Sequence, residues 1–236
     1  MISVIIPAYN HADELPKTLD ALFSQDYNDV EIIVVNDGST DNTEEALAPY
    51  RNRITYLVQE NKGAPAARNL GFSHSKGEYV LFCDADLEFI PTALSILVRT
   101  LETHPEVSYA YYSFWWGKKL FKGQSFDADR LHREPYIHTS ALIRREHFPG
   151  FDESIKKFQD WDLWLTMLEQ GHTGYFVDEV LAHIEPRPAG SGISAWLPSF
   201  MYKIPWKRFG IHIALIEKYH TAMRIIKEKH GLALTK

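Results

Sequence analysis

Short apolar runs alternate with amphipathic segments along the first third of the chain. Runs rich in β-branched and aromatic residues have the length of strands buried on both faces: residues 2–6, 30–35, 54–58 and 79–83. Between the first two runs, residues 13–24 carry leucines at helical spacing. Strand–helix units of this size join through right-handed crossovers into a parallel sheet. The pattern therefore predicts an α/β protein with an open, doubly wound sheet.

The next two connections also contain helix signals. Asp41-Asn42-Thr43-Glu44 resembles a helix start with a glutamate at the third helical position. Farther along, Pro65 suits a first helical turn, and Gly77 follows the end of that helix. In the second half, apolar spacing predicts a helix over residues 91–103, and an aromatic-rich segment predicts a strand over residues 107–116.

Polar and small residues follow each of the first four predicted strands. These segments are Pro7-Ala8-Tyr9-Asn10, Asn36-Asp37-Gly38-Ser39, Glu60-Asn61-Lys62-Gly63 and Asp84-Ala85-Asp86. Ligands of open α/β sheets bind beyond the carboxyl ends of the strands. Magnesium in proteins usually takes one or two carboxylates together with substrate phosphates. Asp84 and Asp86 therefore predict a divalent-cation site for a diphosphate-bearing substrate, while ordinary turn chemistry stays open as the alternative.

Charge and cysteine content narrow the class of protein. The net charge of −6 argues against a general nucleic-acid partner, although residues 203–236 carry a net +6. The single cysteine, Cys83, excludes intramolecular disulfides, and its apolar surroundings favour a buried structural thiol. No basic leader precedes the first strand, and no apolar stretch reaches the ~20 residues that span a bilayer. We therefore expect a soluble, cytoplasmic protein.

Ordered motifs across the first 90 residues carry a family resemblance. In chain order they are Ser3-Val4-Ile5-Ile6-Pro7-Ala8-Tyr9-Asn10, Val35-Asn36-Asp37-Gly38-Ser39-Thr40-Asp41, Asn61-Lys62-Gly63 with Ala67-Arg68-Asn69-Leu70-Gly71, and Asp84-Ala85-Asp86. Together they resemble the motifs of family 2 glycosyltransferases with the GT-A fold, loosely as far as residue 195. The resemblance implies a Rossmann-like, open, mostly parallel sheet flanked by helices. No Gly-x-Gly-x-x-Gly follows the first strand, which argues against a dinucleotide-binding domain.

The resemblance implies a nucleotide pocket at the strand ends. Pro7, Ala8 and Tyr9 would form its floor, with the Tyr9 ring beside the base. Asp37 would accept a hydrogen bond from the base. Arg68 would reach the nucleotide or its phosphates, where a guanidinium makes oriented, charge-assisted bonds.

The Asp84-Ala85-Asp86 motif would complete the donor site under the same resemblance. Asp84 and Ala85 would lie at the donor, with Asp84 near the ribose. Asp86 would bind Mg²⁺ or Mn²⁺ that bridges the two phosphates. Such a cation neutralises the charge that builds on the departing nucleoside diphosphate.

The segment Gln159-Asp160 is similar to an acidic pair, most often Glu-Asp, that opens a helix in the family. The resemblance implies that Asp160 is the general base of an inverting displacement, which needs no covalent intermediate. Asp162 is the rival base, but residues two apart on a helix do not share a face. Gln159 removes a charge beside the base, so repulsion should raise the pKa of Asp160 less than in the family.

Residues 180–192 only partly resemble the family's closing loop. Arg187 stands about where the family has a histidine and His183 comes early, so the third metal ligand stays unassigned. Aromatic side chains of the second half have two open roles, stacking on acceptor sugars or filling the core. They are Tyr111, Tyr112, Trp115, Trp116 and Trp161.

The resulting prediction is an inverting, metal-dependent transferase. It would move a sugar from a nucleoside-diphosphate sugar, first of all a UDP-sugar, to a hydroxyl of a carbohydrate or lipid-linked acceptor in polysaccharide, glycolipid or glycoprotein synthesis. A non-catalytic sugar-nucleotide-binding module is one alternative. A sugar-phosphate nucleotidyltransferase is another, although that class usually carries a Gly-rich basic loop after the first strand.

We expect a catalytic domain over residues 1–195, with a nucleotide-sugar half (1–90) and an acceptor half (91–195). A basic, aromatic, helical tail would follow over residues 196–236. Three roles stay open for the tail: contact with an anionic membrane surface, packing on the catalytic domain, or formation of a homodimer.

Overall fold

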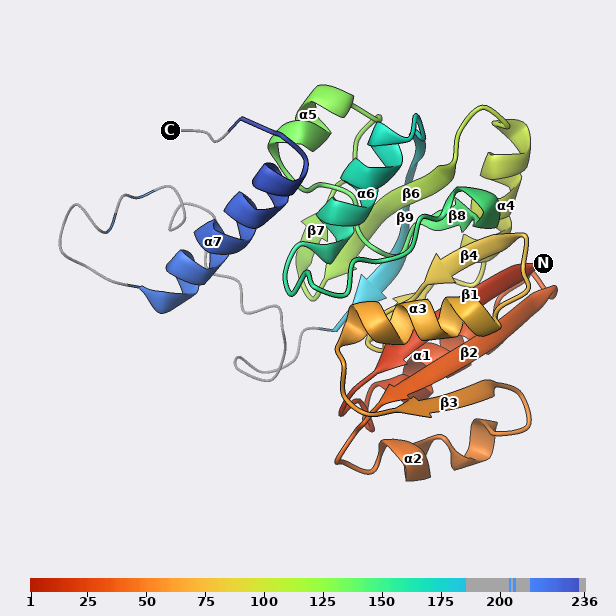
Figure 1. Ribbon diagram of the computed structural model, residues 1–236. Coiled ribbons are helices and arrows are strands. Elements are labelled where there is room, and N and C mark those ends of the chain that lie inside the picture. The colour runs from red at the N-terminus through yellow and green to blue at the C-terminus, as the bar shows by residue number, and fades with distance from the viewer. Residues whose placement is uncertain (186–203, 205, 207–212, 234–236) are drawn as a thin grey trace.

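The predicted alternation of strands and helices is confirmed in the computed structural model, which describes residues 1–185, 204, 206 and 213–233 (Figure 1). The described strands are β1 Ile2–Ala8, β2 Val30–Asp37, β3 Thr55–Gln59, β4 Tyr79–Phe82, β5 Leu87–Phe89, β6 Tyr109–Trp116, β7 Lys119–Phe121, β8 Leu142–Arg144 and β9 Gly174–Ile184. The described helices are α1 Leu15–Phe23, α2 Thr43–Ala46, η1 Ala48–Tyr50, α3 Ala64–His74, α4 Ala93–Thr103, α5 Ala128–Arg133, η2 Arg145–His147, α6 Gln159–Glu169 and α7 Ala214–Lys229.

The strands form one sheet in the order β3-β2-β1-β4-β8-β6-β9-β5, with β7 paired to β6. β1 is parallel to β2 and β4, and β2 is parallel to β3. β8 is antiparallel to both β4 and β6, so those two strands run in the same direction, and β9 is parallel to β6. The carboxyl ends of β1–β4, β6 and β9 therefore share one edge of a mostly parallel sheet, as the sequence predicts.

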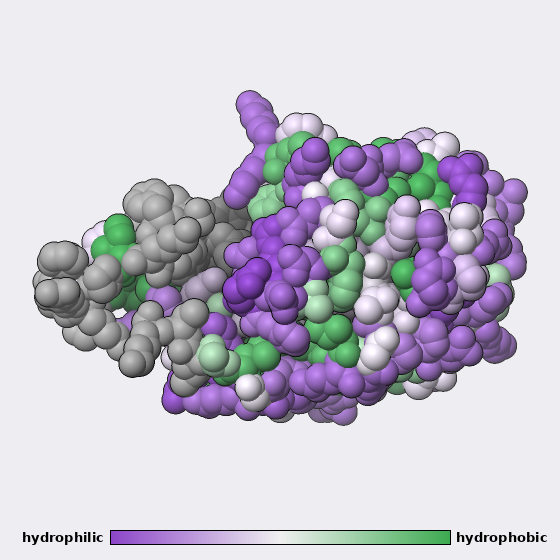
Figure 2. All heavy atoms as spheres, turned by 90° about the horizontal axis from the view of Figure 1, so that it is seen from above, coloured by the Kyte–Doolittle hydropathy of each residue, from purple (hydrophilic) through white to green (hydrophobic). Residues whose placement is uncertain are grey.

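Helices cover both faces of this sheet. Side chains of α1 and α4, such as Leu19 and Leu97, belong to the buried cluster on one face. Side chains of α3 and α6, such as Ala67 and Trp164, belong to the cluster on the other. In Figure 1, α3 crosses in front of β1 and β2 while α1 lies behind them. Seen from above in Figure 2, the surface is mainly hydrophilic, with the apolar residues in separate patches.

The expectation that all four early strands are buried on both faces is wrong for β3. This strand lies at the edge of the sheet, and its Val58 side chain is 62% exposed. The connection before it contains only α2, of four residues, and the three-residue helix η1. These short helices do not cover the outer face of an edge strand.

The C-terminal helix α7 lies beside α6 (Figure 1). Ile226 is fully buried there, and the Tyr219 ring centroid lies 5.2 Å from that of Phe158. The described helix of the tail therefore packs on the preceding part of the chain, which agrees with one of the three roles left open by the sequence. Lys203, Lys207, Arg208 and Arg187 lie outside the described residues. Within the described ranges, no helix is long and apolar enough to cross a membrane.

Candidate active site

A buried arginine joins the two halves of the chain. Arg68 of α3 is 6% exposed, and its Nη2 lies 2.7 Å from Oδ1 of Asp84, directly beyond β4. Its Nη1 donates to Oε1 of Gln159 at 3.0 Å, at the start of α6. Its Nε is buried with no hydrogen-bond partner in the described part of the chain. Arg68 therefore fixes the spacing between the predicted donor carboxylate and the helix that carries Asp160.

A histidine that the sequence analysis did not single out stands on the other side of Asp84. His138 Nε2 lies 3.7 Å from Asp84 Oδ2, and its Nδ1 lies 2.7 Å from the Ser140 hydroxyl. That hydroxyl also lies 2.7 Å from the buried Tyr112 hydroxyl. Trp164 holds the segment in place, because its Nε1 donates to the carbonyl of Ile137 at 3.0 Å.

Arg68 and two histidines act on the pKa of the Asp84 carboxyl in the same direction. Burial alone would raise the pKa of Asp84, but Arg68, His138 and His11 outweigh burial and hold this pKa below its ordinary value. Asp84 is therefore a permanent anion near neutral pH, suited to a structural or ligand-binding role.

Asp160 has the opposite tendency. Burial raises the pKa of Asp160 above its ordinary value, against the opposing influence of His138 and Arg68. Asp160 is the second residue of α6, and its Oδ1 accepts from the amide of Trp161 at 2.8 Å. Phe158, just before the helix, has a left-handed backbone with φ of 61°. That conformation is uncommon outside glycine, asparagine and aspartate, and it sets the direction in which α6 starts. A carboxylate with a raised pKa is a better proton acceptor than an ordinary one.

Asp162 points to the tail and is 3% exposed. Its Oδ1 lies 2.8 Å from Lys229 Nζ and 2.9 Å from His230 Nε2. Both partners come from the end of α7 or just after it, so the carboxylate of this rival base is already paired.

The predicted nucleotide floor lies at the ends of β1 and β2. Ala8 pairs in register with Asn36, and Pro7 with Val35, and both floor residues are buried. Tyr9 follows them and is 44% exposed. This register places the carboxyl ends of β1 and β2 side by side.

Asp37 is tied to the loop between β3 and α3. Its Oδ1 accepts from Gln59 Nε2 at 2.6 Å and from the Lys62 amide at 2.9 Å, and its Oδ2 accepts from the Gly63 amide at 2.8 Å. A carboxylate offers roughly four lone-pair sites. One site on Oδ2 remains for a ligand. Of the three bonds, two hold the loop between β3 and α3, and one ties Asp37 to Gln59 at the end of β3.

The residue set beyond β4 fits a hard divalent cation. Asp86 is half-buried, and the carbonyl of Ala85 accepts from Thr18 Oγ1 at 2.9 Å, which fixes the turn between the two carboxylates. Magnesium commonly binds one or two carboxylates and completes its shell with waters and substrate phosphates. Within residues 1–185, 204, 206 and 213–233, no three His, Cys, Asp or Glu side chains form a metal-ligand group.

Most aromatic side chains of the second half fill the core. Tyr111, Tyr112 and Trp161 are at most 6% exposed, whereas Trp115 is 39% exposed. His183 lies within β9 rather than in a loop, with its Nε2 3.9 Å from Glu185 Oε2. Cys83 is fully buried, as expected, and burial together with Asp84 and Asp86 raises the pKa of its thiol.

The model of the family described as "Glycosyl transferase family 2" matches residues 3–156. The chain belongs to glycosyltransferase family 2. An uncharacterised glycosyltransferase of Rickettsia typhi is 30% identical to this family 2 chain over 227 residues, which cover 89% of it and 71% of the relative. WfaP of Escherichia coli, named a UDP-Glc:α-D-GlcNAc-diphosphoundecaprenol β-1,3-glucosyltransferase, is 27% identical over 72% of this chain and 71% of its own.

Solved structures share the GT-A fold of this glycosyltransferase. S. aureus TarS 1–349 in complex with UDP-GlcNAc has a TM-score of 0.74 at 19% identity, covering 99% of this chain and 68% of TarS 1–349. The mannosyltransferase PcManGT of Pyrobaculum calidifontis, in complex with GDP-Man and Mn²⁺, has a TM-score of 0.61 at 23% identity, covering 83% of this chain and 59% of PcManGT. These likenesses bear on the fold, and the present chain spans only part of each solved chain.

Proposed function

We propose that this family 2 glycosyltransferase is an inverting, metal-dependent enzyme that transfers a sugar from a UDP-sugar to an acceptor hydroxyl. The observation that carries the proposal is the Arg68 bridge, which joins Asp84 to Gln159 beside Asp160. This bridge brings together the guanidinium of Arg68, which would bind an anion, the carboxylate of Asp84, which would face the sugar donor, and the carboxylate of Asp160, which would act as the base. UDP is the favoured nucleotide because TarS is described with UDP-GlcNAc, and WfaP is named for UDP-Glc.

The donor would lie across the ends of the first four strands. Pro7, Ala8 and Tyr9 line the base pocket, and the free site on Asp37 Oδ2 accepts from the base. Arg68 would face the phosphates, because its buried Nε–H has no hydrogen-bond partner in the described part of the chain and could donate to a phosphate oxygen.

Asp84, Ala85 and Asp86 would hold the diphosphate end of the donor. Asp86 is the proposed ligand of Mg²⁺ or Mn²⁺, and Mn²⁺ accompanies GDP-Man in the described PcManGT complex. The cation supplies charge neutralisation on the diphosphate oxygens. Asp84, held by Arg68 and His138, orients the ribose from the other side of the motif.

Asp160 acts as the general base. The acceptor hydroxyl gives its proton to the Asp160 carboxylate as the hydroxyl oxygen bonds to the anomeric carbon. The bond from that carbon to the diphosphate breaks, and its electron pair leaves with the nucleoside diphosphate. The raised pKa of Asp160 favours this proton transfer. One displacement from the opposite face inverts the anomeric centre.

The proposed acceptor is a carbohydrate or a lipid-linked saccharide of the kind used in cell-envelope polysaccharide synthesis. The name of WfaP, which acts on a sugar-diphosphoundecaprenol, supports the lipid-linked class. The family 2 match and the relatives' names favour this role over a nucleotidyltransferase.

A thermal-shift panel tests the donor site. UDP, GDP, TDP and CMP would each be added with Mn²⁺, with Mg²⁺ and with EDTA. A ligand at ~100 times its Kd adds about 2.7 kcal/mol to the folded state, which gives a visible shift. We expect a metal-dependent shift with UDP that is lost in Asp86→Ala and kept in Asp129→Ala, a matched change of an exposed aspartate on α5.

The same panel, combined with an assay of sugar transfer from the UDP-sugar, distinguishes a glycosyltransferase from a non-catalytic binding module. Asp160→Asn should keep the nucleotide shift and lose transfer by at least about 100-fold, the usual scale of general-base catalysis. A nucleotide shift without turnover by the parent would favour a non-catalytic binding module. No shift with any nucleotide would overturn the donor assignment.

A further inference from the structure

The β6–β7 hairpin exposes apolar side chains on both of its faces. Trp115, Leu120 and Phe121 are 39%, 38% and 39% exposed. Trp115 pairs across the strands with Leu120, and Phe114 pairs with Phe121. Directly opposite residues lie on the same face, and successive residues alternate between faces. The apolar surface therefore wraps around the hairpin.

The charge of the hairpin differs from that of the chain. Residues 114–123 contain Lys118, Lys119 and Lys122 and no acidic residue, in a chain of net charge −6. All three lysines are exposed, and Lys119 Nζ lies 4.5 Å from the centroid of the Phe121 ring. Exposed aromatic side chains beside lysines suit the surface of an anionic lipid bilayer, where the apolar interior lies next to negatively charged headgroups.

The side chains of the hairpin offer hydrogen-bond donors, from its lysines and tryptophans, but no acceptor for sugar hydroxyls. Residues 114–123 include no Asp, Glu, Asn, Gln, Ser or Thr side chain. Sugar hydroxyls in such a subsite require polar partners to fix their orientation. An anionic lipid surface asks only for buried apolar area and nearby positive charge, and both are present.

The hairpin projects from the carboxyl-terminal edge of the sheet, the edge at which the candidate active site lies. β6 runs in the same direction as β4, so its carboxyl end and the turn after it lie beyond the same edge as Asp84. The Phe114 ring centroid lies 4.8 Å from that of His138, which in turn lies 3.7 Å from the Asp84 carboxylate.

We propose that the β6–β7 hairpin docks this protein on an anionic lipid surface. Trp115, Leu120 and Phe121 enter the interface, and the three lysines contact lipid phosphates. The docking needs neither the sugar donor nor turnover, so it stands or falls separately from the proposed function. If the docking and the proposed function both hold, the sheet edge that carries Asp84 faces the membrane surface where lipid-linked acceptors reside.

Vesicle co-sedimentation of the full chain tests the proposal. We expect binding to phosphatidylglycerol-containing vesicles and little binding to phosphatidylcholine vesicles. A lysine near an anionic surface adds about fivefold to the partition coefficient, so the Lys118/Lys119/Lys122→Gln variant should bind about 100-fold more weakly. The matched control changes three other exposed lysines, Lys17/Lys76/Lys156→Gln, and should bind like the parent.

A second variant tests the apolar contribution. Trp115→Ser/Leu120→Ser should weaken vesicle binding, while Val58→Ser, at a 62% exposed site on β3, should not. The Tm of each hairpin variant without nucleotide should equal that of the parent, which reports that the variant is folded.

Three results would overturn the proposal. They are no binding of the parent to phosphatidylglycerol vesicles, equal binding by the hairpin variants, and loss of binding only in Lys203/Lys207/Arg208→Glu of the tail. A fluorescence titration with glucose 1-phosphate adds a fourth, because hairpin-dependent binding of that sugar phosphate without vesicles would reassign the surface to a saccharide.

Discussion

Replacing Asp162 by asparagine should undock α7 from the rest of the protein. Asp162 is 3% exposed and pairs with Lys229 at 2.8 Å and with His230 at 2.9 Å. The His230 side chain is 2% exposed and also lies 2.7 Å from Glu169. Removing one partner of a buried ion pair costs about 3–5 kcal/mol. Lys229 is 35% exposed, so solvent screens its share, and we expect about 3 kcal/mol.

The pH dependence of stability gives this prediction a second signature. Burial alone would lower the pKa of His230, but its hydrogen bonds to Asp162 and Glu169 outweigh burial and raise it. A group whose folded pKa is raised stabilises the fold fully below its unfolded pKa, about 6.5 for histidine. That stabilisation is lost as the pH rises through the folded pKa. The parent should therefore lose stability above about pH 6.5, and Asp162→Asn should show less of this loss.

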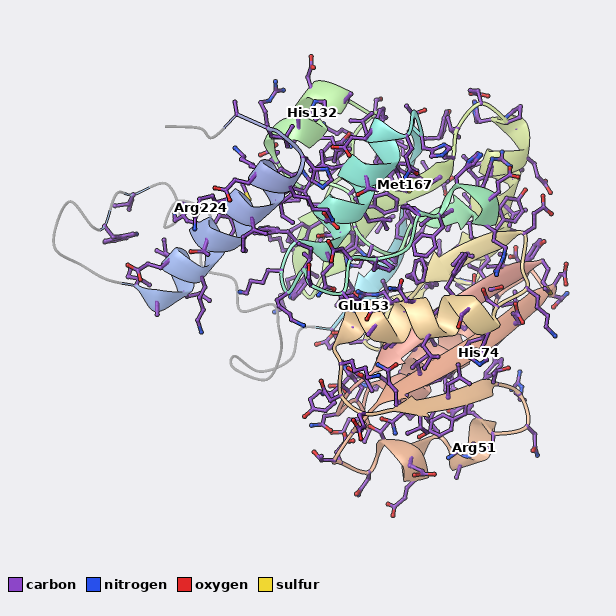
Figure 3. The ribbon with its side chains drawn as sticks, in the orientation of Figure 1. Arg51, His74, His132, Glu153, Met167 and Arg224 are labelled. Carbon is purple, nitrogen blue, oxygen red and sulfur yellow. The ribbon has the colours of Figure 1, made fainter. Side chains whose placement is uncertain are left out.

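Calorimetry and hydrogen exchange measure the effect. A domain of this size shifts by roughly 2–4 °C per kcal/mol, so Tm should fall by about 6–12 °C if α7 unfolds with the core. If α7 detaches alone, its amides should exchange faster while Tm changes little. The matched control is Arg224→Gln, which removes an exposed pair with Glu228 on the same helix (Figure 3). A variant with the Tm, the pH profile and the α7 exchange of the parent would refute the reasoning.

Two further substitutions probe the core and the base. Gly77→Ala should destabilise the fold by about 1–3 kcal/mol in urea unfolding, because an added Cβ would lie 2.6 Å from the Ser3 amide nitrogen. An unchanged urea midpoint would contradict this packing. Gln159→Glu should move the acidic limb of the pH–kcat profile to higher pH, since a second carboxylate would raise the pKa of Asp160 by repulsion. A profile identical to that of the parent would count against Asp160 as the base.

The apolar pattern predicted the central strands well for a physical reason. β1 and β2 are buried by helices on both faces, so their sequences are almost continuous apolar runs. The same reasoning failed for β3, because edge position is a property of the whole sheet and leaves little trace in five residues. The three-residue strand β8 is too short to give any period, although it runs antiparallel to both of its neighbours, β4 and β6.

The residues of the candidate site also differ in whether a local sequence pattern could predict them. Asp84 and Arg68 were predicted because each belongs to a motif with a fixed place beside a strand or on a helix. His138 lies in an irregular segment. It is positioned by a hydrogen bond from the indole N–H of Trp164 to the carbonyl of the neighbouring Ile137, and these two residues are 27 apart in sequence. No local pattern carries that information, and the contact becomes visible only once the core is assembled.

The first turn of α6 explains how one short segment meets these separate demands. Successive helical residues point about 100° apart, so four consecutive side chains face in different directions. Gln159 reaches Arg68, while Trp161 turns inward, where its Nε1 donates to the Leu131 carbonyl at 2.6 Å. Asp162 reaches α7. The Asp160 carboxylate is close enough to His138 and Arg68 for both to lower its pKa, against the effect of burial. Since the neighbours of Asp160 are anchored on three sides, its carboxylate is positioned by α3, the core and α7 together.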